Sequence, residues 1–213
     1  MRGTRPLIIA LSLLFSNIDI SLAYDERHLN QIKALNSCVK CDLSKSDLRK
    51  LNAKEASLMN ADFSGSVLAS GDFRSANLVK ANLRNSDLTA AKLNFANLQE
   101  ANLEKSILRH AILKNANLKG AKLRKADLSK ANLAGANLAR TNLTKAVLRK
   151  VNLKGANLTA SNFHKSILQG VNLSGANLTR ADFTDAKIEN VWFVDALFCR
   201  TKMPWGLEAP HCK

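Results

Sequence analysis

The chain has 213 residues, of which 46% are hydrophobic but only 5% are aromatic, and its formal net charge is +15. This length suits one well-filled core. The scarcity of large rings argues against a conventional globule and predicts a narrow interior filled by Ala and Leu. The positive charge favours acidic partners or surfaces and excludes no fold.

The first 23 residues have the order of a secretory signal peptide. Arg2 and Arg5 precede the apolar run PLIIALSLLF, and small residues stand at Ser21 and Ala23. This order predicts cleavage before Tyr24. An uncleaved membrane anchor is the alternative, but the apolar run is shorter than the roughly 20 residues that span a bilayer. We therefore expect an exported protein, in the periplasm, the thylakoid lumen or outside the cell.

Residues 24–40 are expected to form a short N-terminal capping helix. Leu29, Ile32 and Leu35 recur every three residues and can share one face, while Asp25 and Glu26 lie near the helix N-terminus, where acidic groups are favoured. This apolar face would cover the start of the segment that follows.

Residues 41–200 divide into 32 groups of five without an insertion or deletion. The middle position of each group is Leu, Phe or Ile, except at Ala53; the position two before it is mostly small, and the one between is mostly Asn or Asp. On an α-helix a step of five advances about 140° and leaves no core face. On a straight strand an odd step alternates faces. The chain must therefore turn a corner in each group, which predicts a solenoid.

A slower rhythm indicates how many corners close one coil. Ala-Asn-Leu recurs every 20 residues, at 76–78, 96–98, 116–118, 136–138, 156–158 and 176–178. Four groups therefore make one coil, and eight coils stacked at the usual strand spacing give a rod of about 38 Å. Leu would fill the axis beside Ala or Ser, and Asn or Asp would hydrogen-bond the turning backbone.

Groups such as ANLKG, ADLSK, ANLAG and ANLTR resemble the pentapeptide-repeat family. The resemblance covers about three quarters of the chain and implies an all-β fold, a right-handed quadrilateral parallel β-helix. The flanks NSCVKCDLSKSDL and LFCRTKMPWGLEAPHC are similar to those of exported members. Some members are thought to imitate DNA with an acidic rod, from which this basic, exported chain departs.

Four cysteines in an exported protein suggest disulfides. Cys38 and Cys41 lie at the start of the rod, and Cys199 and Cys212 at its end, too far apart for cross-pairing. A Cys199–Cys212 bridge would clip the tail, residues 201–213, onto the last coil. A Cys38–Cys41 bridge competes with the interpretation of Cys41 as a buried thiol.

The CxxC spacing of Cys38 and Cys41 is also found in redox and zinc motifs. A redox pair normally opens a helix in a βαβ unit, which this sequence lacks. A zinc site needs two further ligands, and His28 is the single candidate close in sequence. Both interpretations are weaker than the structural one, and we expect no metal and no cofactor.

Catalytic constellations are not indicated by the sequence. His110 and His164 fall on different corners more than two coils apart, and the aspartates occupy ordinary turn positions. No phosphate loop, HExxH or GxSxG motif is present. We therefore expect a protein that is not an enzyme.

The distribution of charge indicates which ligands the chain could bind. Residues 1–23 carry a net +1, so the mature chain keeps +14, and residues 105–165 hold 14 Lys or Arg against one acid, Asp127. Four lysines spaced by 20 should form a vertical ladder with Arg124, Arg84 and Lys122 nearby; they are Lys105, Lys125, Lys145 and Lys165. Their mutual repulsion could be relieved by an anionic polymer or lipid surface. The alternative is a solvated basic face, and nucleic acid is disfavoured because stacking aromatics are scarce.

One column departs from the Asn/Asp rule. Residues 47, 67, 87, 107, 127, 147, 167 and 187 read Asp, Val, Asp, Ile, Asp, Val, Ile and Lys. β-Branched residues suit a flat β-face, and Ile107, Val147 and Ile167 could also form a contact strip for a partner or a second copy. The sequence thus predicts a structural or protein-interaction scaffold, with a basic rod that binds an anionic envelope polymer or membrane as the alternative.

Overall fold

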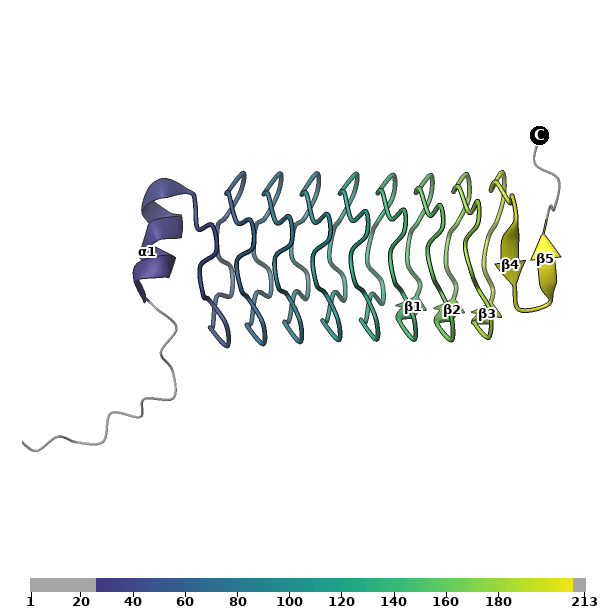
Figure 1. Cartoon of the computed structure of the whole chain (residues 1–213), viewed down its shortest axis with the longest axis horizontal. Coiled ribbons are helices and arrows are strands. Elements are labelled where there is room, and N and C mark those ends of the chain that lie inside the picture. The colour runs from purple at the N-terminus through teal and green to yellow at the C-terminus, as the bar shows by residue number, and fades with distance from the viewer. Residues whose placement is uncertain (1–25, 209–213) are drawn as a thin grey trace, which may run out of the picture.

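The computed structural model describes residues 26–208, which form a rod capped by a helix at one end and a β-hairpin at the other (Figure 1). The predicted signal peptide, residues 1–23, lies outside the described residues. Within the described part, no helix is long and apolar enough to cross a membrane.

Successive coils are joined by parallel backbone hydrogen bonds between residues that lie about 20 apart. Leu68 N donates to Asp87 O at 2.7 Å, and Asp87 N donates to Ser66 O at 2.9 Å. The same register continues from Ser37 and Ser57 at the start to Asp182 and Lys202 at the end. The predicted coil of four groups is therefore confirmed, and the chain is a right-handed quadrilateral β-helix.

Each corner is shaped by a side chain and by one residue in the left-handed region. The Asn or Asp of a group accepts a hydrogen bond from the backbone N–H two residues later, as in Ser64 N to Asp62 Oδ1 at 2.7 Å and Lys154 N to Asn152 Oδ1 at 3.1 Å. The fifth residue of the group has positive φ, for example 60° at Lys125 and 66° at Gly155. The predicted turn role of Asn and Asp is confirmed.

The core is a continuous column of Leu and Phe with Ala, Ser or Thr beside it. Buried hydroxyls donate to backbone carbonyls, as in Ser86 Oγ to Leu83 O at 2.7 Å. In residues 26–208 no buried side-chain polar atom lacks a partner. The interior is therefore closely packed, and its polar side-chain atoms are hydrogen-bonded. Any binding function must lie on the outer faces.

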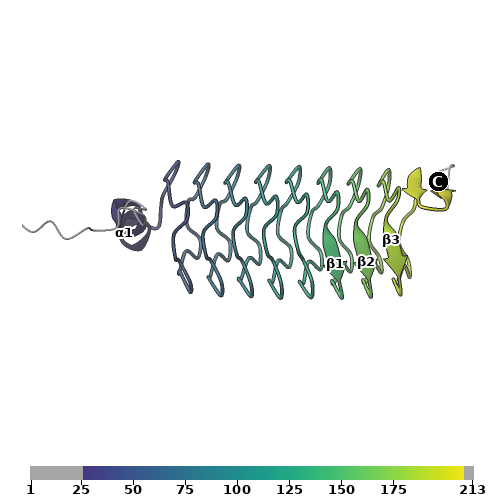
Figure 2. The same cartoon turned by 90° about the horizontal axis from the view of Figure 1, so that it is seen from below.

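Three short strands lie in the column of second positions that lacks Asn and Asp at its C-terminal end. β1 (Val147–Arg149), β2 (Ile167–Gln169) and β3 (Lys187–Glu189) form a parallel sheet in which Val147 pairs with Ile167 and Ile167 with Lys187 (Figure 2). These three rungs lack the side-chain acceptor that starts the turn elsewhere; Val67 and Ile107 in the same column also lack it but form single bridges. The interpretation of Val147 and Ile167 as β-branched residues on a flat β-face is confirmed.

The N-terminal cap is the helix α1 (Glu26–Leu35), which ends before residue 40, the predicted end of the 24–40 segment. Ile32 is buried and Leu29 packs against the core, but Leu35 is 69% exposed. The prediction that all three share one face is wrong for Leu35, because each step of three falls about 60° behind a full turn. The coils begin before residue 41, since Cys38 N already donates to Ser57 O at 2.7 Å.

At the other end, β4 (Thr201–Met203) continues the rod, because Lys202 N donates to Ala181 O at 2.9 Å. β4 then turns back into β5 (Gly206–Glu208), which pairs with it antiparallel. The predicted boundary after residue 200 is therefore too early, and residues 201–208 form a final strand and a hairpin.

Four aromatic residues gather near the last coil, and only two of them pack into its interior. Phe193 and Phe198 pack against the core with ring centroids 5.4 Å apart. Trp192 and Trp205 are 57% and 63% exposed. Trp192 occupies the outward position that holds Asn172 one coil below, so its ring cannot enter the axis.

Candidate binding face

The four lysines predicted to stack are at the fifth position of their groups, on one corner of the rod. We call Lys105, Lys125, Lys145 and Lys165 the lysine ladder. Their φ values are 58°, 60°, 59° and 57°, which is the corner conformation described above. All four side chains are exposed. The predicted vertical ladder is therefore present as a geometrical feature.

Carboxylates neutralise only part of this ladder. Lys165 Nζ lies 3.9 Å from Asp185 Oδ2, and no acid pairs with Lys105, Lys125 or Lys145 among residues 26–208. Arg84, Lys105, Arg124 and Lys125 line a hollow of about 180 Å³ together with Glu104. Glu104 lies just outside the acid-poor stretch noted in the sequence, and it offsets part of the positive charge there.

An apolar strip follows on the adjoining face. We use this name for Ile107, Val147 and Ile167. Ile107 is 37% exposed, while Val147 and Ile167 are half-buried on neighbouring rungs of the β1–β2 pair. Along β1 the burial pattern is half-buried, buried and exposed, so Val147 and Arg149 both face outward while Leu148 enters the core.

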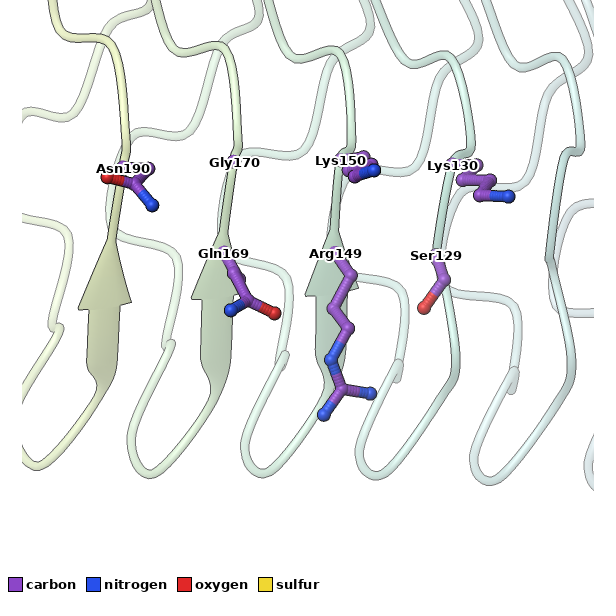
Figure 3. A pocket seen from close by; sticks show the side chains of 7 residues that line it. All are labelled: Ser129, Lys130, Arg149, Lys150, Gln169, Gly170 and Asn190. Atoms are coloured by element: carbon purple, nitrogen blue, oxygen red, sulfur yellow. The ribbon is translucent and has the colours of Figure 1, made fainter.

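Beyond the strip lies a second basic edge, on the next corner of the rod. Its residues surround a hollow of about 410 Å³, which we call the basic hollow; they are Ser129, Lys130, Arg149, Lys150, Gln169, Gly170 and Asn190. In Figure 3 these residues form two rows along the rod, with Gly170 between Lys150 and Asn190. Because Gly170 has no side chain, the row opens at that rung.

Three cations of the basic hollow have no acidic partner in the described part of the chain: Lys130, Arg149 and Lys150. All three are exposed. Of the two acids nearby, Asp127 is paired with Arg109, whose Nε lies 2.6 Å from Asp127 Oδ2. Glu189 accepts a hydrogen bond from the neutral Gln169 side chain at 3.0 Å and keeps its negative charge at the edge of the hollow.

Asp127 interrupts the apolar strip, and its contacts show that its charge is compensated. Burial alone would raise the pKa of Asp127, but hydrogen bonds from the Ser129 hydroxyl and backbone, and from Arg109, hold it below its ordinary value. The carboxylate is therefore ionised near neutral pH and held by Arg109. It contributes little negative charge to a ligand on this face.

The lysine ladder, the apolar strip and the basic hollow together make one face. Within a single coil, Lys145 stands at one edge, Val147 in the middle and Arg149 with Lys150 at the other edge. Since Val147 and Ile167 are adjacent rungs, this arrangement extends along the rod axis. The residues predicted to form a contact strip thus lie in one column, interrupted by Asp127, with cations on both sides; their role in contact stays a prediction.

Two of the cysteines play a structural part at the start of the rod. Cys38 and Cys41 are buried and joined by a disulfide with a Cα–Cα distance of 5.4 Å. This bridge excludes both the free-thiol and the zinc interpretation of the pair. Cys199 is not a free thiol, and its predicted partner Cys212 lies outside the described residues, so that pairing stays a prediction.

The three histidines among residues 26–208 do not form a site. His28 Nδ1 lies 3.1 Å from Asp42 O, which ties α1 to the first coil. His164 Nδ1 lies 3.8 Å from Asp185 Oδ2, and His110 stands on another corner of the rod. Among residues 26–208, no group of His, Cys, Asp and Glu could hold a metal ion.

A family model described as pentapeptide repeats matches the chain in eight copies, over residues 37–65, 68–104, 91–129, 126–164 and 156–193. The chain belongs to the pentapeptide-repeat family. A comparison with curated proteins finds no match.

A solved structure of a trypsin-treated QnrB1 variant shows the same fold, and the structures of two further pentapeptide-repeat proteins are similar to this chain. QnrB1, a plasmid-mediated fluoroquinolone resistance protein, is 21% identical over 76% of this chain and 88% of its own, with a TM-score of 0.52. HetL from the cyanobacterium Nostoc sp. strain PCC 7120 is 24% identical over 84% and 96%, with a TM-score of 0.31. A thylakoid-lumen pentapeptide-repeat protein from Arabidopsis thaliana is 26% identical over 67% and 68%, with a TM-score of 0.21.

The sequence signal for the basic hollow is weak. Lys130 and Lys150 are spaced by 20, as the ladder lysines are, but the column breaks at Gly170 after only two such rungs. Arg149 belongs to a different column, which reads Ser129, Arg149 and Gln169. Only the position of the corner in space brings the two columns together.

Proposed function

We propose that this pentapeptide-repeat rod is a non-enzymatic, exported scaffold that binds a protein partner through the face described above. The observation that carries this proposal is the apolar strip with its two basic edges, on a rod whose core is filled and whose buried polar atoms are satisfied. A rigid solenoid with one chemically distinct face is suited to recognition along its length. An apolar line with charged margins has the composition of a protein-binding surface.

Export is part of the proposal. It is supported by the charged, apolar and small-residue order of residues 1–23 and by the disulfide between Cys38 and Cys41, which suits an oxidising compartment. The periplasm, the thylakoid lumen and the cell exterior all meet this condition. N-terminal sequencing of the mature protein tests it: we expect Tyr24 as the first residue, and an intact N-terminus on the folded protein would contradict export.

A second candidate function is binding of an anionic envelope polymer or membrane surface. It is favoured by Lys105, Lys125 and Lys145, which have no acidic partner in residues 26–208. Such binding would be almost wholly electrostatic and would fall steeply as salt rises. The apolar strip would contribute nothing to it.

A salt series on immobilised mature protein separates the two functions. The protein is exposed to extract from its native compartment, and to beads that carry anionic lipid or polymer, at low and high salt. The scaffold proposal expects a protein that stays bound at high salt. Retention of the beads alone, lost at high salt and lost when Lys105, Lys125, Lys145 and Lys165 become Gln, would overturn the scaffold in favour of the second function.

A further inference from the structure

We propose that the basic hollow and the apolar strip together bind an extended, acidic segment of the partner in which carboxylate side chains alternate with apolar ones. This inference rests on the proposed scaffold function and names the chemistry of its partner. It follows from three features of the face: the uncompensated cations, their position beside the strip and the gap at Gly170.

The basic hollow carries positive charge that is not paired with a carboxylate of the described residues. Lys130, Arg149 and Lys150 line one hollow, and none of them has a carboxylate partner in the described residues. Arg109 is excluded from this set because Asp127 holds it. Cations on neighbouring rungs, about 4.8 Å apart, repel one another until an anion lies between them. The hollow is therefore complementary to carboxylates, and Arg149 can bind one through two N–H groups.

The apolar strip lies directly beside the cations of the hollow. On β1, Val147 and Arg149 both face outward and are two residues apart, and on β2 the pair is Ile167 and Gln169. A ligand that reaches the hollow from this face therefore contacts apolar and cationic side chains side by side. A polymer of charges alone would leave Val147 and Ile167 uncovered, whereas an alternating peptide covers both.

The basic hollow has room for a ligand side chain at Gly170. Gly170 is on the rung next to that of Lys150, and a β-carbon at Gly170 would lie 3.6 Å from Lys150 Cγ. The φ of +64° at Gly170 is the left-handed corner conformation. The neighbouring rungs of this column carry Lys130, Lys150 and Asn190. The hollow therefore opens where the column loses its side chain (Figure 3), and the stems of the lysines form its walls.

A second copy of the chain is a poor occupant of this face. The mature protein carries a net charge of +14, so two such faces brought together would repel each other. Charge complementarity instead requires an acidic partner.

The test measures the binding of short fluorescent peptides to the mature protein by anisotropy. One peptide alternates Glu with Leu, and a second alternates Glu with Ser at the same length and charge. We expect the Glu–Leu peptide to bind at least about tenfold more tightly, because only it covers the strip. Equal affinities of the two peptides would overturn the inference and leave a general anion-binding surface.

Variants locate the binding. Replacing Lys130, Arg149 and Lys150 with Gln should weaken the Glu–Leu peptide about tenfold. The matched control, Lys114, Lys119 and Lys154 to Gln, removes the same charge from exposed positions on the other corners and should leave affinity within about twofold. Equal weakening by both triple variants would overturn the inference, since net charge alone would then explain binding.

A third variant tests the strip. Val147→Asn with Ile167→Asn should lower the affinity for the Glu–Leu peptide to that for the Glu–Ser peptide. A single cooperative thermal transition, within a few degrees of that of the wild type, shows that the fold is intact. Anionic lipid vesicles serve as a further probe: hollow-dependent binding of vesicles without binding of either peptide would overturn the inference in favour of a membrane. If no peptide binds while a protein is still retained at high salt from native extract, the inference fails and the scaffold function stands.

Discussion

A β-carbon at Gly71 would lie 2.5 Å from Cε2 of Phe73. Gly71 occupies the inward slot that holds Ala or Ser at most corners, and Phe73 occupies a slot that Leu fills in the next coil, at Leu93. The absent methyl group therefore makes room for the ring. Phe73 in turn meets Phe63 edge-on, with ring centroids 6.4 Å apart.

This relationship predicts a compensating pair of substitutions. Gly71→Ala should lower the free energy of unfolding by about 1–3 kcal/mol through overpacking, and Phe73→Leu alone by about 1 kcal/mol through lost ring contacts. The double variant restores the Ala and Leu arrangement of the next coil, so it should cost less than the sum of the two. Urea unfolding followed by circular dichroism measures all three, and additive losses would show that the two sites are independent.

The apolar strip should be dispensable for folding. In Val147→Asn the new side chain can accept a hydrogen bond from the Arg149 backbone N–H, as Asn152 does from Lys154. We expect the free energy of unfolding of Val147→Asn with Ile167→Asn to stay within about 1 kcal/mol of wild type. Thermal melts check this, and a loss of several kcal/mol would mean that the β-branched residues are retained for packing.

The lowered pKa of Asp127 predicts that the stability of the protein depends on pH. Its pKa in the folded protein lies below the ordinary value of 3.8, so its stabilising contribution is fully present above that value and is lost as pH falls through the folded-state pKa. Asp127→Asn keeps an acceptor for the Ser129 N–H but cannot titrate. The difference in melting temperature between wild type and this variant should therefore narrow as pH falls below about 4. A constant difference would show that the carboxylate is not preferentially ionised in the folded state.

The disulfides can be mapped directly. Peptide mapping of the unreduced mature protein should yield a Cys38–Cys41 bridge and a Cys199–Cys212 bridge. Because the first closes a loop of only four residues, its removal by Cys38→Ser with Cys41→Ser should cost about 2 kcal/mol by loop entropy. Any peptide that links one end of the rod to the other would contradict the fold.

The repeat made the coil predictable from the sequence, since the size and polarity of each position follow from whether it points to the axis, the turn or the solvent. Leu35 shows where this logic stops. Its spacing matches that of Leu29 and Ile32, but the exposure of Leu35 depends on how α1 lies across the first coil. β4 still has the inward, outward and inward pattern of a coil, with Thr201 and Met203 buried. β5 lies beyond residue 203, where the five-residue pattern ends, so the repeat does not place it.

The candidate face was predictable in part. The lysine ladder and Val147 are visible as columns in the sequence, because residues 20 apart must stack. The basic hollow joins two columns, neither of which is continuous, and its opening depends on a single glycine, Gly170. The ion pair between Arg109 and Asp127 likewise joins side chains 18 residues apart, so which cations remain uncompensated could be determined only from the structure.

Site-specific photo-cross-linking in the native compartment tests the central claim, that one face of this rod binds a protein partner, most directly. A photoreactive residue is placed at Val147 on the apolar strip or at Asn157, two corners further along the same coil and therefore on the opposite face. We expect a protein adduct from position 147 that is absent from position 157 and that the Glu–Leu peptide competes away. Adducts of equal yield from both positions, or from position 157 alone, would contradict the claim.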